Sequence, residues 1–283
     1  ISNTRKNLIQ YNIKNLKDFW QETQVQTWRW FIHSKRRPIV VISGLMQPII
    51  WITLFAIVFK NSMGEILGGE SYLAFITPGA LLFTAFNASL NAGVPILFDR
   101  ELGFLDRVRV APLSDRFSIV LSSAIHIFTI TLLQCLVIIG ATTLLGVSFS
   151  GGVKGACVAL LVLSLVILSF TSISLALAFR FKRHFEMLAV IMIVTLPMIF
   201  LSSAFNSLDQ LPKTLANIVI FNPVTMAIEP LRLVYSNSNF DLLEPLANSF
   251  LGALNALHFI LGLIGFNILA GIYCKNILRE KLH

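Results

Sequence analysis

Charge is scarce in this sequence. Asp, Glu, Lys and Arg make up 13% of its 283 residues, against roughly 25% in ordinary soluble domains. Hydrophobic residues make up 55%, and the mean hydropathy is +0.77. Aromatic side chains with a polar atom are also few, with 4 Tyr and 4 Trp against 23 Phe. This composition excludes an ordinary soluble domain and predicts an integral membrane protein, whose main solvent is the lipid bilayer.

Cysteine is nearly absent as well. Cys135, Cys157 and Cys274 lie in or beside apolar runs, without a C-x-x-C pair or a His at the spacing of metal ligands. This pattern disfavours both a disulfide framework and a zinc site, and we expect the three side chains to pack as small apolar groups. We therefore expect no metal and no cofactor in this chain.

Six apolar stretches are long enough to cross hydrocarbon about 30 Å thick, which takes about 20 helical residues. They run over residues 38–59, 72–97, 117–145, 156–179, 187–205 and 250–273. We predict an all-α membrane protein with a six-helix transmembrane domain over residues 38–283 and a cytoplasmic segment over residues 1–37. No apolar run precedes residue 38. We therefore expect no cleavable signal, and the first span must direct its own insertion.

Charged residues avoid these six stretches. If the chain crosses six times, eighteen of its 22 Lys and Arg residues lie on the side that holds both termini and the second and fourth loops. The other side holds Lys60, Lys154, Lys213 and Arg232. Because cytoplasmic loops collect Lys and Arg, both termini are predicted to face the cytoplasm, or the stroma of a plastid. The same rule explains the net charge of +8 without a nucleic-acid partner, for which no binding motif is visible.

The missing intramembrane charge also bears on function. A carrier driven by an ion gradient usually keeps an ionisable group at membrane depth, and only His126 and His258 qualify. Each stands alone on an apolar helix, where a hydrogen-bonded packing role is the simpler interpretation. No catalytic motif such as G-x-S-x-G or H-E-x-x-H is present, and GGVKGA at residues 151–156 lacks the Lys-Ser/Thr ending of a phosphate-binding loop. We expect no catalytic residues, so any pumping must draw its energy from another molecule.

The segment before the first span has the pattern of an interfacial helix. Val25, Trp28 and Ile32 recur at i, i+3 and i+7, and the basic run Lys35, Arg36 and Arg37 follows. Such a helix lies along the membrane surface, with its aromatic rings at headgroup level and its cations toward anionic lipid. Membrane lipid is therefore an expected partner.

Two other polar features interrupt the apolar pattern. Asn87 and Asn91 lie one helical turn apart in the second span, where they either glue helices together or line a substrate pathway. Between the fifth and sixth spans, residues 211–221 and 225–235 are too short and too polar to cross. We predict two short re-entrant or surface helices there, with a break at Asn222–Pro223.

The sequence DRELGFLDRVRVAPLSDR, residues 99–116, concentrates charge directly after the second span. On a helical projection most of the charges gather opposite Phe98 and Leu102, so the segment can lie at the membrane surface. Glu101 and Arg109 instead fall on the apolar side, where a protein socket could pair them. The residues by themselves leave two interpretations open, a binding site for a partner and an ordinary positively charged loop.

This segment resembles the signature of the type-2 permease subunits of ATP-binding-cassette exporters, in which Arg-Glu, Gly, Leu and Pro-Leu follow the second span. The resemblance continues at Gln47–Pro48 and Trp51, and at residues 211–212. It departs at Phe104 and Ala111, where Thr is common in the family. In detail the sequence is similar to the branch found in cyanobacteria and encoded in algal plastid genomes. The matching signature residues are Arg100, Glu101, Gly103, Leu105, Pro112 and Leu113, and those before the last span are Asn222, Pro223, Glu229 and Arg232.

The resemblance implies a half-transporter with six spans, an amphipathic helix before the first, and outer re-entrant helices before the sixth. Two copies would pair as a homodimer in a plastid membrane or a cyanobacterial inner membrane. Each copy would bind a separate ATPase subunit, which would hold the ATP and magnesium. Residues 99–116 would then pass nucleotide-driven closure of the ATPases to the second span. The residues expected to couple to the ATPase are Arg100, Glu101, Gly103, Leu105, Arg107, Arg109, Pro112 and Leu113.

Other functional classes stay open at this point. A lipid scramblase or a gradient-driven secondary carrier would share the six spans but would need no ATPase, and a non-transporting assembly factor is a third class. An ATPase that copurifies with the chain and responds to it would separate the exporter from the others.

Overall fold

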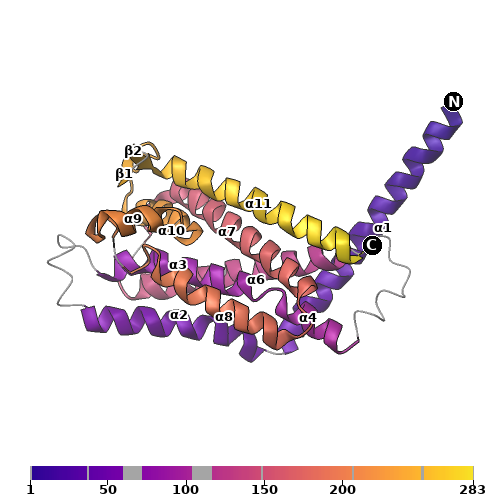
Figure 1. Cartoon of the computed structure of the whole chain (residues 1–283), viewed down its shortest axis with the longest axis horizontal. Coiled ribbons are helices and arrows are strands. Elements are labelled where there is room, and N and C mark those ends of the chain that lie inside the picture. Colours follow the sequence, from indigo (N-terminus) through magenta and orange to yellow (C-terminus); the bar gives the residue numbers. More distant parts are fainter. Residues whose placement is uncertain are drawn as a thin grey trace.

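The computed structural model describes residues 2–36, 38–59, 72–103, 117–147, 149–205, 207–249 and 252–282. Over these residues the protein is a bundle of helices with a small β-hairpin at one end (Figure 1). This architecture confirms the predicted class of an all-α membrane protein. The elements are α1 (Ser2–Arg36), α2 (Pro38–Phe59), α3 (Tyr72–Leu90), α4 (Val94–Glu101), α6 (Phe117–Leu144), α7 (Gly152–Arg180), α8 (His184–Phe200), η1 (Leu208–Gln210), α9 (Lys213–Ile220), α10 (Pro223–Ser236), β1 (Pro245–Ser249), β2 (Gly252–Asn255) and α11 (Ala256–Leu282).

Most of the apolar stretches coincide with helices. Four helical segments are each long and apolar enough to cross a membrane, namely Leu73–Glu101, Ser118–Leu144, Gly152–Arg180 and Ala256–Glu280. The first of these contains both α3 and α4, with a turn at residues 91–93. Helix α2 matches the first predicted span, and it meets α1 at a bend of 64° between Lys17–Arg36 and Val41–Leu54. That all six stretches cross a membrane remains a prediction.

The fifth and sixth predicted spans have different bounds in the structure. The fifth is the 17-residue helix α8, which ends at Phe200, and residues 201–205 form turns instead of helix. Helix α11, which corresponds to the sixth predicted span, begins only at Ala256, because residues 252–255 pair with β1 in the hairpin. Asn255 marks the start of α11, since its Oδ1 accepts a hydrogen bond from the His258 backbone N–H at 3.3 Å. Apolar composition alone does not distinguish these turns and strands from helix ends.

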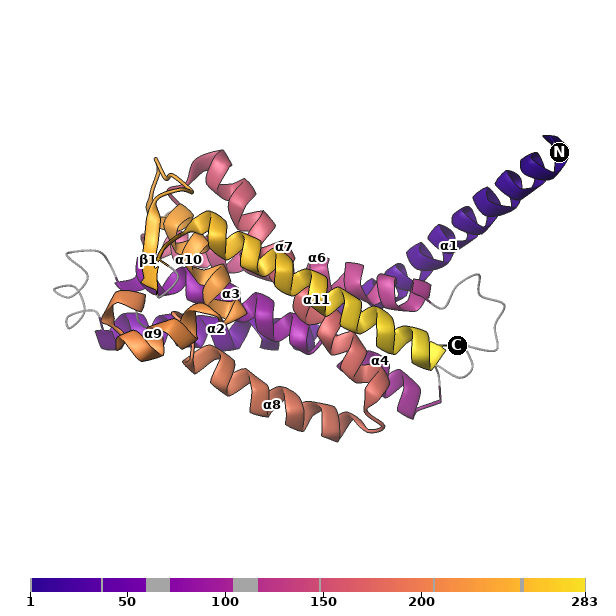
Figure 2. The same cartoon turned by 45° about the horizontal axis from the view of Figure 1, so that its top comes forward.

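Helices α3 and α7 form the centre of the bundle. Helix α7 packs against α3, α6, α10 and α11, and α3 also contacts α2, α6 and α10. Figure 2 shows α11 running along α7, with α8 on the outer side of the bundle. In the core, Phe86 of α3 and Phe170 of α7 make an edge-to-face contact with their ring centroids 4.7 Å apart. Both rings are buried, and such pairs add to the dispersion energy of close packing.

Polar side chains join helices inside this apolar bundle. The Asn267 amide on α11 donates to Ser169 Oγ at 3.0 Å and to the Leu165 carbonyl oxygen at 3.1 Å, both on α7. The Gln134 amide on α6 donates to the Val41 carbonyl oxygen on α2 at 3.0 Å. In lipid the hydrophobic effect does not drive helices together, so such bonds and close packing must hold the bundle.

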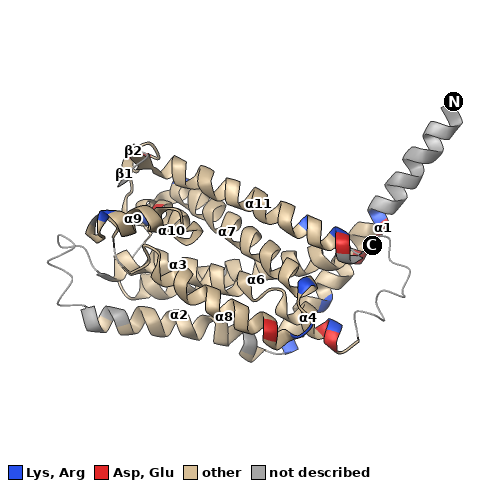
Figure 3. Cartoon of the chain, viewed as in Figure 1, with Lys and Arg blue, Asp and Glu red and all other residues tan. Residues whose placement is uncertain are grey.

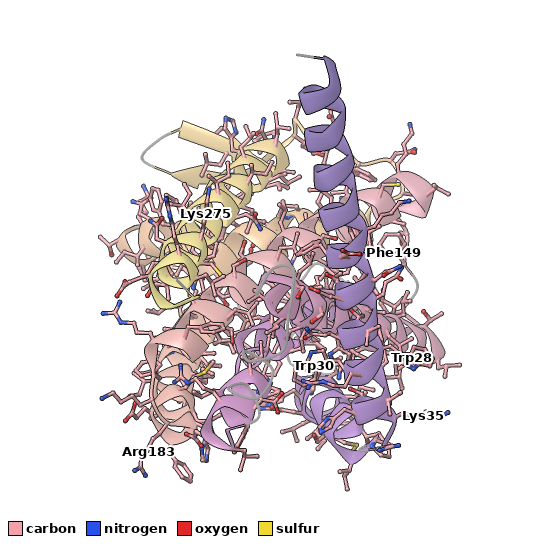
Figure 4. All side chains as sticks on the ribbon, turned by 90° about the vertical axis from the view of Figure 1, so that its right-hand side faces the viewer. Trp28, Trp30, Lys35, Phe149, Arg183 and Lys275 are labelled. Carbon is pink, nitrogen blue, oxygen red and sulfur yellow. The ribbon has the colours of Figure 1, made fainter. Side chains whose placement is uncertain are left out.

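Charge gathers at the two ends of the bundle and leaves the middle apolar (Figure 3). We call the end that holds α4, the first residues of α8 and the C-terminus the α4 end. The opposite end, with α9, α10 and the β-hairpin, is the hairpin end (Figure 1). Side-chain contacts and helix ends place Arg29, Asp99, Arg100, Glu101, Arg180 and Glu186 at the α4 end. Figure 4, which faces this end, also labels Lys35, Arg183 and Lys275.

Candidate functional site

Three consecutive charged residues, Asp99, Arg100 and Glu101, end helix α4. Each side chain contacts a different part of the bundle. The Asp99 carboxylate accepts a hydrogen bond from Arg29 Nη2 at 2.8 Å, which joins α4 to α1. Both side chains of this pair are partly exposed, at 39% for Arg29 and 28% for Asp99. Solvent therefore limits the pair to at most about 1 kcal/mol, and its main effect is to set orientation.

Arg100 contacts the end of α7. Its Nη1 donates to the carbonyl oxygen of Phe179 at 3.3 Å, and its Nη2 donates to the carbonyl oxygen of Phe181. Helix α7 ends at Arg180, so these carbonyls lack the partners that the interior of a helix supplies. A cation at this position also interacts favourably with the negative end of the helix dipole. Arg100 thus caps α7 from another helix.

Glu101 contacts the start of α8. Its Oε1 accepts the backbone N–H of His184 at 2.6 Å, and its Oε2 bonds to His184 Nδ1 at 2.6 Å. Helix α8 begins at His184, so the carboxylate satisfies a free amide at the positive end of that helix. The Phe98 ring stacks on the His184 ring, with 4.3 Å between the centroids. The charged triplet therefore connects the second span to α1, α7 and α8 together.

Gly103 lies just after the end of helix α4. Its backbone has φ +70, and its N–H donates to the Arg100 carbonyl oxygen at 3.1 Å. A Cβ at this position would meet nothing within 4 Å. The left-handed backbone, rather than lack of space, thus requires glycine here, as is common just after a helix. The other predicted coupling residues, Leu105, Arg107, Arg109, Pro112 and Leu113, lie outside the described residues.

A second feature, which the sequence analysis did not find, lies where α3 meets α4. The Ser174 hydroxyl on α7 donates to the Leu90 carbonyl oxygen at 2.5 Å and accepts the Gly93 backbone N–H at 2.9 Å. Ser174 is completely buried, with no exposed surface. The run of Gly93, Val94 and Pro95 could have indicated a break in the second span, but nothing local points to Ser174.

Asn87 and Asn91 lie just before this break. The Asn91 amide donates to the Asn87 backbone oxygen at 2.8 Å and to Asn87 Oδ1 at 3.1 Å. Both residues are half-buried. The two asparagines therefore bond to each other along one helix, and their role in packing or in a pathway stays a prediction.

At the hairpin end, α9 and α10 meet at 92°. The break falls at Asn222–Pro223, the predicted position, and Pro223 starts α10. Asn222 Oδ1 accepts the Val224 backbone N–H at 2.9 Å and so caps α10. Its amide donates to the carbonyl oxygens of Met198 and Leu201, at 2.7 Å and 2.6 Å. One side chain thus joins the start of α10 to the end of α8.

Glu229 and Arg232 form an ion pair on α10, with 3.0 Å between Oε1 and Nη1. The side chains are nearly buried, at 9% exposure for Glu229 and 14% for Arg232. Arg232 Nη2 also donates to the Ser203 carbonyl oxygen at 2.7 Å, and its guanidinium lies 4.0 Å from the centroid of the Phe75 ring. The pair therefore connects α10 to α3 and to the segment after α8.

Helix α1 is held against α6 by a cluster around His126. The Ser34 hydroxyl and His126 Nε2 share a hydrogen bond of 2.8 Å, and the Trp30 and His126 rings stack with centroids 6.1 Å apart. Trp30 is 6% exposed, whereas Trp28 is 67% exposed and lies on another side of α1 (Figure 4). His126 thus has the hydrogen-bonded packing contact that was its simpler interpretation. The exposed Trp28 and Val25 fit the predicted lipid-facing side of α1.

The described residues contain no group of three His, Cys, Asp or Glu that could hold a metal ion. The contacts of the charged triplet at the α4 end include the Arg29–Asp99 ion pair and the contacts of Arg100 and Glu101 with helix ends.

Comparison with known proteins identifies the family. The model of the ABC-2 type transporter family matches residues 21–235. The chain is 39% identical over 263 residues to the transport permease ycf38 of Cyanophora paradoxa, and 36% identical over 264 residues to that of Pyropia yezoensis. Both alignments cover 93% of this chain and 90% of the relative. A daunorubicin resistance ABC transporter permease, DrrB1 of Streptomyces coeruleorubidus, is 26% identical over 220 residues, which are 77% of this chain and 76% of that protein. The chain belongs to the ABC-2 type transporter family and is a membrane subunit of a transporter.

Proposed function

We propose that this chain is the membrane half of an ATP-driven exporter. Two copies pair, and each binds a separate ATPase chain at the α4 end. The observation that carries the proposal is the charged triplet at residues 99–101, which contacts α1, α7 and α8 at the point where the predicted coupling segment begins. The resistance permease among the relatives favours export as the direction of transport.

Through the charged triplet, a movement of the coupling segment, residues 99–116, would reach other helices of the bundle. A displacement applied to residues 104–116 by a partner would enter α4 through Gly103 and reach three other elements through three charge-assisted contacts. Hydrogen bonds to charged groups are stronger and better oriented than neutral ones, so a displacement of α4 would move the elements to which these contacts join it. A loop that served only to orient the chain in the membrane would not need these directed contacts.

An external energy source fits the composition of the long helices. Helices α2, α3 and α6 contain no Asp, Glu, Lys or Arg, and those of α7, α8 and α11 lie toward the helix ends. A carboxylate that binds a proton or sodium ion at membrane depth, usual in gradient-driven carriers, is missing from the described parts of these helices. ATP hydrolysis by another chain would supply the energy in its place.

The charge distribution also sets the proposed orientation. Among the described residues, most Lys and Arg lie at the α4 end, so this end would face the cytoplasm or the stroma. The ycf38 relatives come from algae, which favours a plastid membrane, and a cyanobacterial inner membrane is the related setting. With this orientation the α4 end would face the compartment that contains ATP.

The test is copurification. The tagged chain is coexpressed with ATP-binding-cassette ATPase chains from the same genome, and the detergent-extracted complex is assayed for composition and ATP hydrolysis. We expect one ATPase to copurify in a complex with two copies of each chain, and its hydrolysis rate to change when the permease is bound. Glu101→Ala and Arg107→Ala should lower this association, whereas Lys275→Ala is a control that removes an exposed charge at the same end.

Vesicles that contain only this chain separate the alternatives. The exporter predicts no uphill transport and no rapid lipid exchange without the ATPase. Lipid scrambling by the chain alone, or uptake driven by an ion gradient, would instead identify a scramblase or a secondary carrier and refute the proposal.

A further inference from the structure

The second span is broken at residues 91–93, and two backbone groups lose their helical partners there. In a continuous α-helix the Gly93 N–H would bond to the Ser89 carbonyl, and the Leu90 carbonyl would accept the Val94 N–H. Here the Ala92 N–H takes the Ser89 carbonyl at 3.2 Å, and the Val94 N–H takes the Asn91 carbonyl at 3.1 Å. Gly93 N–H and the Leu90 carbonyl are thus left without a partner from their own helix.

The cause of the break is local. Pro95 has no N–H to give to the Asn91 carbonyl, and its ring would clash with that carbonyl in a regular helix. Within a membrane, backbone groups freed in this way must find partners on neighbouring helices. The partner in this structure is a single atom, Ser174 Oγ on α7, which bonds to both freed groups at 2.5 Å and 2.9 Å.

The break also rests directly on the backbone of α7. A Cβ at Gly93 would lie 2.3 Å from the Ser174 carbonyl oxygen and 3.0 Å from Ala178 Cβ. No side chain fits between the two backbones at this point, so glycine is required by the close approach. The contact is therefore tight and is centred on one buried hydroxyl.

The break separates two segments with different surroundings. Helix α3 is packed in the core against α2, α6, α7 and α10. Helix α4 contacts α7 and α8, and it carries the charged triplet at its far end. A hydroxyl has one donor and two acceptor positions and can rotate about its C–O bond. It can therefore keep both hydrogen bonds while the segments on either side change their angle.

We propose that Ser174 is a positioning residue, whose hydroxyl makes residues 91–93 a hinge with a fixed point on α7. Helix α4 stays joined to α7 through Ser174 and Arg100, and it changes its angle to α3 about residues 91–93 when the partner ATPase closes and opens. The inference rests on the proposed function for its role in the transport cycle, but the hinge itself is a property of this chain and can be tested without a partner.

The first test measures the hinge in the purified permease alone. Spin labels are placed on Leu102→Cys, 77% exposed beyond the end of α4, and on the native Cys157, which is exposed on α7. The other cysteines, Cys135 and Cys274, are buried and so escape labelling. We expect a narrow distance distribution in the parent and a clearly broader or shifted one in Ser174→Ala. An unchanged distribution in Ser174→Ala would overturn the proposal.

Two variants separate the hinge from general loss of structure. Ser172→Ala removes a hydroxyl two residues away that bonds only within α7, to the Leu168 carbonyl oxygen at 2.7 Å, and it should keep the parental distribution. Ser174→Thr keeps a hydroxyl at the hinge and should restore the parental distance distribution at least in part. If Ser172→Ala broadens the distribution as much as Ser174→Ala, any lost serine has this effect and the hinge is refuted.

The second test uses the complex with the ATPase. Ser174→Ala leaves two buried backbone groups unpaired, the Gly93 N–H and the Leu90 carbonyl. It should therefore lower the number of substrate molecules moved per ATP by at least about tenfold, while binding of the ATPase stays at the parental level. Equal coupling in Ser174→Ala and Ser172→Ala would show that the hinge has no role in transport. If no ATPase binds the parent chain, the proposed function fails, and the distance measurement still decides the hinge.

Discussion

The ion pair between Glu229 and Arg232 supports a quantitative prediction. Arg232→Met leaves the Glu229 carboxylate, 9% exposed, without its partner. Removing one member of a buried ion pair costs about 3–5 kcal/mol, because the remaining charge stays desolvated. The variant also loses the bond to the Ser203 carbonyl and the contact with the Phe75 ring, and the latter is worth about 0.5–2 kcal/mol. We therefore expect a loss in the free energy of unfolding of about 4 kcal/mol or more.

The partner variant behaves differently. Glu229→Gln keeps an oxygen that can accept from Arg232, and the guanidinium keeps its other contacts, so the loss should be about 1–2 kcal/mol. In the double variant, no buried carboxylate is left alone. Its loss should therefore fall about 2 kcal/mol short of the sum of the single losses, which is a coupling energy typical of directly contacting residues.

The assay is reversible unfolding in mixed micelles of mild detergent and dodecyl sulfate, followed by tryptophan fluorescence and circular dichroism. Lys213→Met, an exposed cation on α9 at the same end, is the control and should change stability by less than about 0.5 kcal/mol. Losses in the double variant that simply add would show that the two side chains act independently. That result would contradict the assignment of the pair as a joint between α10, α3 and the segment after α8.

Three further predictions concern the helix ends. Gly103→Ala places a side chain at φ +70 and should cost about 1–2 kcal/mol of local backbone strain, which should weaken copurification with the ATPase. Asn tolerates this backbone better, so Gly103→Asn should retain more of the bound ATPase. Equal binding by both variants would argue against a conformational cause. Asn222→Ala removes the α10 cap and frees the Met198 and Leu201 carbonyls, so the loss in the free energy of unfolding should exceed the roughly 0.5–2 kcal/mol of a lost cap. Asn222→Asp keeps the cap acceptor and should lose less stability in a thermal unfolding assay. An equal loss in both variants would disprove the bridge to α8. Ser34→Ala breaks the bond to His126 and should raise proteolysis of α1 without changing the rest of the bundle, which gel fragments and mass spectrometry would show. Parental protection would mean that the other contacts of α1, such as the Trp30 stacking and the Arg29–Asp99 pair, hold it without this bond.

Several features of the fold were readable from local sequence. The lengths and composition of residues 38–59 and 117–145 predict α2 and α6, because any helix exposed to lipid must satisfy its own backbone and present apolar side chains. The break at Asn222–Pro223 was also predictable, since Asn is a good cap and Pro is well placed at the first helical position. Gly103 likewise stands out as a residue that can end a helix.

Other features were missed or placed wrongly for an identifiable reason. Residues 201–205 are apolar enough to extend a helix, but Asn222 takes the carbonyls of Met198 and Leu201 and helps to end α8. Residues 252–255 were assigned to the sixth span, yet they pair with β1. In both cases the deciding partner is elsewhere in the chain, so composition within the segment does not contain the information.

The amino-acid sequence by itself determined the membrane class, the approximate spans, the concentration of charge after the second span and the family resemblance, because these depend on side-chain solvation and on neighbours along the chain. Only the tertiary structure decided what the polar groups do. It brought Ser174 to a break 81 residues away, joined Glu101 to His184 at the start of α8, and placed Arg232 between the Ser203 carbonyl and the Phe75 ring. A buried hydrogen-bonding group needs a partner, but which partner it finds depends on how the helices pack.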